Sequence, residues 1–371
     1  MSVESKSPLA TEFLTIHEFV KAAKIRTNSM AWDYLVGATE TETTLRRNRM
    51  AIDSIALRPR VLCDVSHCDT STKFFGAKLR MPVLLAPVGS LESFSPEGGP
   101  GAAKAAGEFG IPAMMSSVGT MELEQIKDVK GGLKIYQLYV RGDDAWIDAR
   151  VERAIKAGYE AFAITVDTAV YSRRERDIAK RFKKSWRADL TGTDAQAALS
   201  WKNIAHFKKT HKIPLILKGI GTVEDAKIAA EHGVDAIYVS NHGGRQLDHG
   251  RGSLDVLAEV RAALGPKPKL IVDGGFARGT DIVKAIALGA DLVGLGRVYC
   301  YALAAAGQAG VVRMLEILED EMRSAMGLMG VTALPQLNPG YLHRGAPVVT
   351  QPHVFSAFPL LNLDDPGYGG R

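Results

Sequence analysis

From about residue 81 the sequence alternates short apolar runs with alanine-rich stretches of helical periodicity. The apolar runs lack the polar alternation of a half-exposed strand, which predicts strands that are covered on both faces. Strand–helix alternation predicts parallel strands joined by right-handed crossovers. Eight such units, spaced by roughly 25 residues, predict a closed (β/α)8 TIM barrel of the α/β class. The predicted strands are Val83–Ala86, Pro112–Met115, Lys134–Val140, Ala161–Val166, Pro214–Lys218, Ala236–Ser240, Lys269–Val272 and Leu292–Leu295.

An open doubly wound sheet is the structural alternative to the barrel. It usually carries a Gly-x-Gly-x-x-Gly turn after its first strand, whereas residues 86–91 here read Ala-Pro-Val-Gly-Ser-Leu. The sequence therefore favours the barrel. Helices are predicted at Gly99–Glu108, Leu123–Lys127, Asp144–Lys156, Val223–Glu231, Leu254–Ala263 and Gly279–Ala287, with a closing helix at Val311–Met326.

The chain is predicted to form a single domain of residues 1–371, with the barrel at about 81–330, helices within 12–80 and a tail at 331–371. Residues 15–37 have a helical pattern with a break near Thr27, and Thr43 to Ala51 predicts another helix. The long connection from Val166 to Pro214 is predicted to be a mobile loop over the barrel mouth. The tail, rich in proline and glycine, is expected to wrap a neighbour or the surface.

Composition argues against several classes of protein. The net charge of +5 is mild and the basic residues are scattered, so no nucleic-acid surface is expected. The N-terminus shows no secretory pattern, and no apolar segment reaches the roughly 20 residues of a membrane span. Cys63, Cys68 and Cys300 cannot build a disulfide framework and lack zinc-site spacing. Buried free thiols, a cytoplasmic location and no metal site are therefore expected.

Two glycine-bearing turns follow the last two predicted strands. Asp273-Gly274-Gly275 ends the seventh strand and Gly296-Arg297 ends the eighth, and a helix follows each turn. In barrels of this type these turns often bind phosphate through backbone N–H groups and a helix N-terminus, and an arginine can fork onto phosphate oxygens. A single glycine turn could serve only to tighten the chain. Two turns at the expected positions, one with an arginine, favour a phosphate site.

The other strand ends are unusually polar. Each residue alone could be a hydrogen-bonded core side chain, but together they would line one barrel mouth with hydroxyl, amide and ammonium groups. That set suits a flat, heteroatom-rich ring, and with a phosphate site it suggests FMN. A lysine at the N1–C2=O edge of a flavin would stabilise the charge of the reduced ring. These residues are Ser116, Ser117, Gln137, Tyr139, Thr165, Asp167 and Lys218.

His242 and Arg245 lie three residues apart on the glycine-loosened turn after the sixth strand. A histidine at such a strand end is predicted to be a general base. Asp167 is a plausible partner to orient its ring. Arg245 and Arg174 are candidates for binding a substrate carboxylate, although Arg174 could instead be a solvated loop charge.

These segments, in order, resemble the FMN-dependent α-hydroxy acid oxidases and dehydrogenases, which include glycolate oxidase, lactate oxidase and mandelate dehydrogenase. The resemblance runs from about Thr15 to Gly330, and its most specific part is Ser240–Asp248. The other matching segments are Tyr136–Val140, Thr165–Thr168, Arg173–Asp177, Lys218-Gly219, Asp273–Gly275 and Gly296-Arg297.

The resemblance implies a role for each matching residue. His242 would be the base, with Asp167 as its partner, and Arg174 and Arg245 would bind the substrate carboxylate. Tyr34 and Tyr139 would hydrogen-bond the substrate and take part in catalysis with Lys218. The FMN-binding residues would be Pro87, Val88, Gly89, Ser116, Gln137, Thr165, Lys218, Ser240, Asp273, Gly274, Gly275, Gly296 and Arg297.

The sequence departs from the family pattern at three places. Ala277 stands where members often have an arginine, so phosphate binding would rest on the backbone, on Arg297 and on Arg278. The loop after the fourth strand is shorter than in the plant and lactate oxidases, which implies a more open pocket. Gly89 stands where oxidases often have alanine, which resembles the dehydrogenase members and favours a quinone or another acceptor over dioxygen.

The resulting hypothesis is oxidation of an (S)-2-hydroxy acid to the 2-oxo acid, with electrons passing to dioxygen or a quinone-type acceptor. His242 would take the hydroxyl proton in a hydride route or the α-proton in a carbanion route, and the same residues serve both. Val118 and Tyr171 would lie near the substrate side chain, and the small Val118 would admit one larger than that of glycolate, including an aromatic one. The alternatives are another FMN barrel of the isomerase type and a non-catalytic phosphate-binding barrel. A homo-oligomer, by family resemblance a tetramer, is expected.

Overall fold

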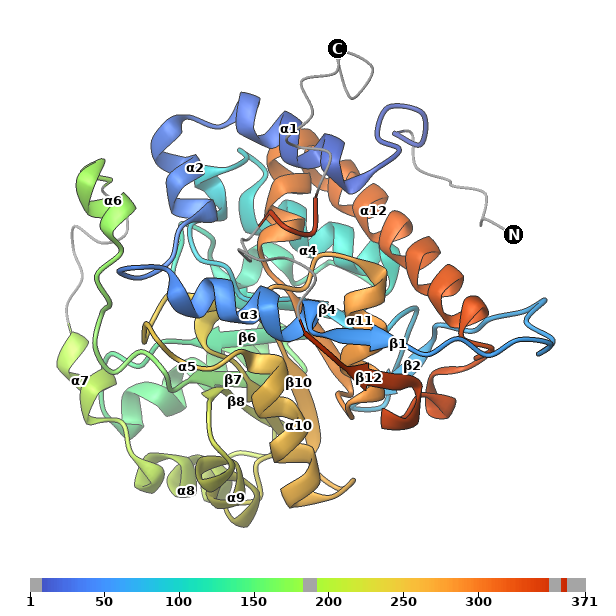
Figure 1. The fold of residues 1–371 in the computed structure, drawn as a ribbon. Coiled ribbons are helices and arrows are strands. Elements are labelled where there is room, and N and C mark those ends of the chain that lie inside the picture. Colours follow the sequence, from blue (N-terminus) through green and yellow to red (C-terminus); the bar gives the residue numbers. More distant parts are fainter. Residues whose placement is uncertain (1–8, 183–191, 347–354, 359–371) are drawn as a thin grey trace.

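The computed structural model describes residues 9–182, 192–346 and 355–358. Its centre is a closed barrel of parallel strands, in which each strand pairs with the next along the chain and β11 pairs with β4 (Figure 1). The predicted (β/α)8 barrel is confirmed. The strands are β4 (Val83–Leu85), β5 (Ala113–Ser116), β6 (Lys134–Leu138), β7 (Ala161–Thr165), β8 (Leu215–Ile220), β9 (Ala236–Val239), β10 (Lys269–Val272) and β11 (Leu292–Leu295).

The inside of the barrel is filled by apolar side chains from its strands, among them Leu84, Met114, Ile216 and Ile271. A hairpin precedes β4 and was not predicted. Its strands β2 (Thr72–Phe74) and β3 (Ala77–Leu79) contribute to the same apolar cluster and close the amino end of the barrel. The inside of the barrel is thus closed at its amino end, and an active site is expected at the carboxyl ends of the strands.

Helices surround the barrel between its strands, as the sequence predicted (Figure 1). The segment Leu123–Ile126 between β5 and β6 is a short 3-10 turn rather than an α-helix. The last helix starts at Arg297, directly after β11, and a kink at Ala306 and Gly307 separates its first part from the stretch predicted at residues 311–326. The barrel helices are α4 (Gly98–Phe109), α5 (Asp144–Lys156), α8 (Trp201–Thr210), α9 (Val223–Glu231), α10 (Ser253–Leu264), α11 (Gly279–Ala287) and the last helix, α12 (Arg297–Leu328).

The connection between β7 and β8 is more regular than the predicted mobile loop. It contains α6 (Glu175–Ala179), α7 (Thr193–Ala198) and the barrel helix α8. Ile204 and Phe207 of α8 are buried three positions apart on one face, and Ser200 begins the helix in a capping box. The loop prediction is therefore wrong for residues 175–179, 193–198 and 201–210, while residues 183–191 lie outside the described part.

Three N-terminal helices precede the barrel: α1 (Ile16–Arg26), α2 (Ser29–Val36) and α3 (Thr43–Asp53). The break predicted near Thr27 is confirmed, because Asn28 caps α2 by accepting a hydrogen bond from Ala31 N. Helix α3 packs on the turn after β9, where Asn48 exchanges side-chain hydrogen bonds with Asn241. The N-terminal segment thus supports the barrel mouth.

The start of the tail returns to the N-terminal segment. Strand β12 (Leu342–Arg344) pairs antiparallel with β1 (Ile55–Leu57), so this part of the tail packs on its own chain, which was one of the two expectations. Residues 347–354 and 359–371 lie outside the described part.

The expectation of buried thiols holds for two of the three cysteines. Cys68 and Cys300 are buried, but Cys63 is exposed, so its prediction as a buried thiol is wrong. Cys63 follows Val61 and Leu62 on a projecting loop whose side chains find no core to enter. Among the described residues, no group of three or more histidines, cysteines or acidic residues could hold a metal ion.

Helix α12 is long and apolar enough, by length and composition, to cross a membrane, although no such segment was expected. Inside the fold, 78% of its most apolar window is buried. Its apolar residues thus serve the packing between α12, α1 and α4, as in the core helix of a globular domain.

Candidate active site

The turn after β9 holds His242 in a strained backbone conformation. His242 has φ of 60°, in the left-handed region that non-glycine residues rarely occupy. Its N–H donates to Ser240 Oγ (3.0 Å), and Asn241 Oδ1 accepts from Gly244 N (3.1 Å). Such conformations cost about 1–3 kcal/mol and cluster at functional sites. The turn thus aims the imidazole into the barrel mouth at a cost in stability.

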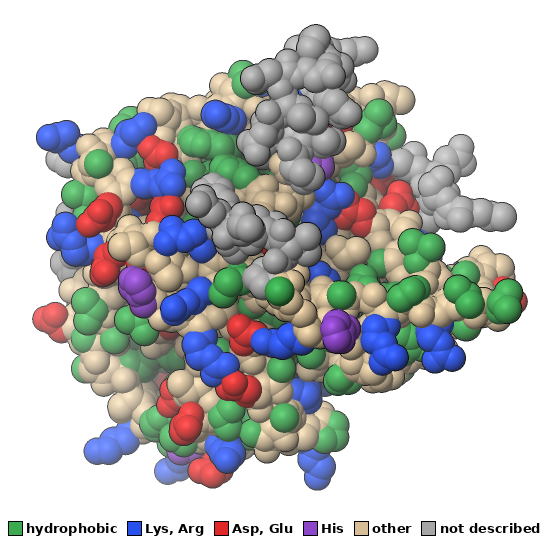
Figure 2. Space-filling view, in the orientation of Figure 1, with side chains coloured by type: hydrophobic (Ala, Val, Ile, Leu, Met, Phe, Trp, Pro, Cys, Tyr) green, Lys and Arg blue, Asp and Glu red, His purple; other side chains and the backbone are tan. Residues whose placement is uncertain are grey.

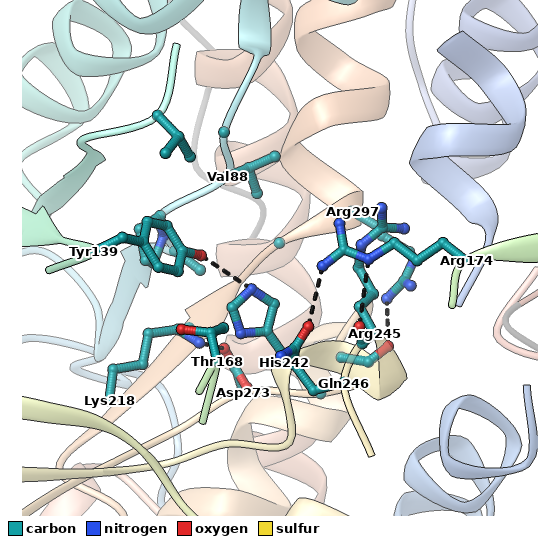
Figure 3. A pocket seen from close by; sticks show the side chains of 18 of the residues that line it. Val88, Tyr139, Thr168, Arg174, Lys218, His242, Arg245, Gln246, Asp273 and Arg297 are labelled. Atoms are coloured by element: carbon teal, nitrogen blue, oxygen red, sulfur yellow. Dashed lines mark hydrogen bonds and ion pairs between the residues drawn. The ribbon is translucent and has the colours of Figure 1, made fainter. Parts of the chain in front are cut away.

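His242 lies between the carboxylate of Asp167 and the phenol of Tyr139, and Figure 3 shows its contact with Tyr139. Its Nδ1 is 3.1 Å from Asp167 Oδ1, and its Nε2 is 3.1 Å from the hydroxyl of Tyr139. Because an ionised carboxylate only accepts, Nδ1 carries the proton, and the lone pair of Nε2 accepts a hydrogen bond from the Tyr139 hydroxyl. This is the tautomer that a general base requires.

The electrostatic surroundings keep the imidazole neutral and the carboxylate charged. Burial lowers the pKa of His242 below its usual 6.5, and the opposing influence of Asp167 does not outweigh burial. Burial by itself would raise the pKa of Asp167, but His242 and Lys218 lower it to below its usual range. The pair can therefore take up a proton on Nε2 and stabilise the resulting imidazolium.

Gly219 makes room for this pair. The register between β8 and β9 shifts between Lys218 and Ile220, and the intervening Gly219 has φ of +111°. A Cβ atom at this position would lie 2.6 Å from both Cβ and Cγ of Asp167. A glycine is needed here because any side chain would push Asp167 away from His242.

Two arginines stand beside the histidine. Arg174 donates to the Arg245 carbonyl (3.3 Å) and to Gln246 Oε1 (3.3 Å), and its guanidinium lies over the ring of Tyr171. Arg245 Nη1 donates to the carbonyls of Tyr34 and Gly37, at 2.7 Å each. Burial, helped by Arg174, lowers the pKa of Arg245 to about 10.

One nitrogen of this pair of arginines lacks a hydrogen-bond acceptor. Nη2 of Arg245 is buried and has no hydrogen-bond partner among the described residues, although Asp177 Oδ2 lies 3.9 Å away. A buried cationic donor without an acceptor is costly. Both arginines line the same cavity as His242, so a small carboxylate placed there could satisfy this donor.

Several predicted cofactor residues form two hydrogen-bonded chains at the strand ends. Ser116 Oγ donates to Gln137 Oε1 (2.8 Å), and Gln137 Nε2 donates to Thr165 Oγ1 (2.8 Å). Lys218 Nζ donates to Ser240 Oγ (3.0 Å), which in turn donates to Asp273 Oδ1 (2.6 Å). Lys218 and Asp273 line the cavity, whereas Ser116, Gln137, Thr165, Ser240 and Asp167 stand behind its wall.

The turn after β10 presents backbone and an alanine to the cavity. Gly274, Gly275 and Ala277 line it, but the N–H of Ala277 donates to Asp281 Oδ2 (3.0 Å). Arg278 was expected to help bind phosphate, and the structure does not bring it there. Its guanidinium pairs with Glu321 (2.5 Å) and donates to the carbonyl of Ala357 (3.4 Å), outside the cavity wall.

Of the two arginines that follow the glycine turns, Arg278 and Arg297, only Arg297 lines the cavity. Its guanidinium donates to the carbonyls of Leu35 (3.1 Å), Gly243 (3.1 Å) and Gly37 (2.8 Å). Arg297 and Arg245 thereby hold the carboxyl end of α2 against the site, which places Tyr34 at the mouth. Gly296, with no atom within 4 Å of a Cβ built on it, leaves open space beside Arg297.

The turn after β4 forms the opposite wall. Pro87, Val88 and Gly89 line the cavity, and the hydroxyl of Tyr34 donates to the Gly89 carbonyl (3.1 Å). A Cβ on Gly89 would lie 2.6 Å from Cγ2 of Val118 and 2.9 Å from its carbonyl oxygen. Alanine at position 89 would thus require Val118 to move.

All of these walls enclose one cavity of about 650 Å³, which is large enough for a nucleotide-sized cofactor and a small substrate. FMN fits its chemistry. A buried cation and open glycine backbone stand at one end for a phosphate. Buried Lys218, with the polar strand ends behind the wall, stands at the other for a flavin ring. The arrangement defines a barrel enzyme that removes a proton from a small anionic substrate beside a phosphate-bearing cofactor.

Residues that support the site from far along the chain were missed by sequence reasoning. Asn48 of α3 holds Asn241, and Gln196 of α7 accepts from Val140 N (2.6 Å) while donating to the Thr165 carbonyl (2.9 Å). Gln246 donates to the Asp167 carbonyl (2.9 Å). Of these three residues, only Gln246 could have been found from the sequence, because it belongs to the segment Ser240–Asp248.

Comparison with known proteins identifies the family. The family model described as FMN-dependent dehydrogenase matches residues 23–344, and the chain belongs to this family. It is 37% identical to glycolate oxidase 1 of Zea mays, covering 94% of this chain and 99% of that protein. It is 36% identical to an L-lactate dehydrogenase (cytochrome) of Wickerhamomyces anomalus, covering 92% of this chain and 63% of that protein.

A solved structure of mandelate oxidase with 3,3-difluoro-2-hydroxy-3-phenylpropionic acid superposes with a TM-score of 0.84. The two sequences are 36% identical, and the match covers 91% of this chain and 100% of the mandelate oxidase chain. The protein is thus an FMN-dependent enzyme that oxidises 2-hydroxy acids. The isomerase and non-catalytic alternatives are set aside by this membership.

Proposed function

We propose that the protein oxidises (S)-2-hydroxy acids with a large apolar or aromatic side chain, and that His242 is the base. The observation that carries this proposal is one cavity holding both a neutral imidazole with an unprotonated Nε2, which accepts a hydrogen bond from the Tyr139 hydroxyl, and the buried, unsatisfied Nη2 of Arg245. A 2-hydroxy acid offers each of these groups its partner: a proton for the base and a carboxylate for the guanidinium.

FMN, when bound, supplies the two-electron acceptor for the oxidation. The chain would hold it through the backbone of residues 87–89 and of the glycine turns, with Lys218 at the ring and Arg297 at the phosphate. His242 takes the hydroxyl proton if the α-hydrogen leaves with its electron pair, or the α-proton in a carbanion route. In either case Asp167 stabilises the imidazolium, and Tyr139 and Tyr34 hold the substrate oxygens.

The substrate side chain would lie against an apolar part of the cavity. Phe94, Val118, Val140 and Tyr171 line this part, and Phe94 stacks on Tyr34 with ring centroids 5.8 Å apart. Val118 is small, which leaves room for a side chain larger than that of glycolate. The overlay with mandelate oxidase supports this choice. Turnover of (S)-mandelate-sized acids no faster than of glycolate would contradict it.

The electron acceptor is proposed to be a quinone-type compound rather than dioxygen. Gly89 has no side chain beside the proposed flavin position, as in the dehydrogenase members that the sequence resembles. The test is to reduce the enzyme with substrate under anaerobic conditions, then mix it with dioxygen or with a soluble quinone and follow reoxidation. Faster reoxidation by the quinone supports the proposal, and rapid peroxide formation in air makes the enzyme an oxidase.

The rate of flavin reduction is predicted to rise with pH and to level off with a midpoint below 6.5, because the base must be neutral and burial lowers the pKa of His242. Asp167→Asn removes a charge that raises this pKa, so the midpoint should move to lower pH while the plateau rate falls. Stopped-flow reduction between acid and neutral pH measures both. A midpoint that rises in Asp167→Asn would contradict the assignment.

Gly219→Ala is predicted to slow flavin reduction by about a hundredfold, because displacing a catalytic pair by roughly 1 Å has effects of this size. FMN binding should be retained. The matched control is Gly233→Ala: Gly233 also has a positive φ, of +69°, but nothing within 4 Å of a Cβ built on it. Equal losses in both variants would show that backbone strain, rather than contact with Asp167, causes the effect.

We propose that the enzyme is a homo-oligomer, as the sequence resemblance suggested for a tetramer. The loop between β1 and β2 projects from the body with hydrophobic side chains near its tip (Figures 1 and 2). Val61 is 80% exposed and Leu62 is 104% exposed, which suits burial against a second copy. Leu62→Asp is predicted to reduce the mass measured by light scattering. A wild-type monomer would refute the proposal.

A cytoplasmic location is also proposed. The support for it is chemical: the three cysteines are free thiols, as is usual in a reducing compartment. Fractionation of the native cell, with activity followed in each fraction, tests this proposal. Recovery of the activity in the membrane or extracellular fraction would overturn it.

A further inference from the structure

The cofactor cavity is completed by a residue from outside the family range. The family model ends at residue 344, yet Phe358 lines the same cavity as Arg297, Gly296 and Ala277. Phe358 is only 2% exposed. The position of Phe358 therefore suggests that the tail contributes to ligand binding in this cavity.

Each residue of the segment 355–358 has a defined contact. Phe355 stacks on Trp32 of α2, with ring centroids 6.0 Å apart and planes 8° apart, and Ser356 Oγ donates to Asp53 Oδ2 (3.3 Å). Ala357 accepts a hydrogen bond from Arg278. The ring of Phe358 meets Tyr301 edge-on at 6.4 Å and His17 at 5.7 Å. The segment is therefore docked over α1, α2 and the start of α12.

Segment 355–358 packs beside the end of the cavity that is proposed to bind the phosphate. The glycine turns after β10 and β11 contribute few charged side chains to this end. Ala277 replaces the expected arginine, its N–H is taken by Asp281, and Arg278 binds Glu321 and the tail instead of facing the cavity. Arg297 remains to pair with a phosphate there. A single ion pair is strong only where water is kept away, because solvent screens charges that it reaches.

We propose that the C-terminal segment 355–358 is part of the FMN site, and that Phe358 closes its phosphate end. The apolar ring excludes water from the phosphate and Arg297, and it blocks the path by which the cofactor would leave. Arg278 has a different task from the one its position in the sequence suggested, since it tethers this segment through the Ala357 carbonyl.

The test is the rate at which FMN leaves the purified holoenzyme, followed by the recovery of free-flavin fluorescence after dilution. Phe358→Ala is predicted to release FMN on the order of tenfold faster, and Phe358→Leu should restore most of the retention. Phe355 does not itself line the cavity, so Phe355→Ala removes its ring contacts with Trp32 and Tyr301 but keeps Phe358, and it should also speed release. Leu328→Ala, at a residue that is 74% exposed, is the control and should release FMN as the wild type does.

Affinities of the apoenzyme for FMN and for riboflavin complete the test. If Phe358 protects the phosphate, Phe358→Ala weakens FMN binding more than riboflavin binding. A change of less than twofold in FMN release in both Phe358→Ala and Phe355→Ala overturns the proposal, whatever happens to thermal stability. The outcome is independent of which hydroxy acid is the substrate, so it can fail while the proposed function stands.

Discussion

Replacing His242 with glutamine is expected to slow reduction of the bound flavin by a 2-hydroxy acid by about a hundredfold to ten-thousandfold, the usual contribution of a general base. Glutamine can still hydrogen-bond Asp167 and Tyr139, so the fold and FMN content should be unchanged. Stopped-flow spectroscopy under anaerobic conditions gives the reduction rate, and the visible spectrum gives the FMN content.

The matched control for this prediction is His206→Gln. His206 also contacts a carboxylate, at 2.9 Å from Asp148 Oδ2, but it lies outside the cavity. Its replacement should leave the rate unchanged. Reduction of His242→Gln at the wild-type rate would remove His242 from the chemistry and leave its strained φ of 60° without a catalytic reason.

Replacing Arg245 with methionine is the second large effect expected. Losing a buried charged partner of a carboxylate costs about 2–5 kcal/mol, or roughly 30-fold to several thousandfold in kcat/KM. Arg245 also binds the carbonyls of Tyr34 and Gly37, so a loss of activity alone could reflect a displaced α2. The measurement must therefore separate carboxylate binding from support of the helix.

Comparing a 2-hydroxy acid with its neutral amide makes that separation. The wild type should prefer the acid strongly, and Arg245→Met should lose most of this preference because the amide never needed the cation. Arg245→Lys keeps the positive charge but not the planar, bidentate guanidinium, so its preference for the acid should lie between those of the wild type and Arg245→Met. If acid and amide lose activity equally, Arg245 holds α2 and does not bind the substrate carboxylate.

Much of the barrel could be predicted from the sequence because its signals are local. Runs such as Ala161–Val166 are apolar throughout and lie between helical stretches, and strands and helices were found within a few residues. Helix α8 was missed because it follows a polar stretch of small residues, and only the burial of Ile204 and Phe207 shows its apolar face. The β2–β3 hairpin is too short to stand out in the sequence.

The site was predictable where one segment carries several groups, and it was not predictable where distant groups meet. His242 and Arg245 share a turn, and Asp167, predicted as the partner of His242, follows a strand whose carboxyl end opens on the same barrel mouth. The bond between Asn48 and Asn241 joins residues 193 positions apart, and no local pattern marks it. Arg278 was expected at the phosphate because of its position, but Glu321 of α12 draws its side chain away.

The most direct test of the central proposal is anaerobic titration of the purified, FMN-loaded protein with a panel of (S)-2-hydroxy acids that ranges from glycolate to mandelate. The proposal predicts that the visible flavin absorption is lost on mixing, faster with the larger and aromatic acids, with one equivalent of 2-oxo acid formed per flavin. A flavin that stays oxidised with every acid in the panel would contradict it.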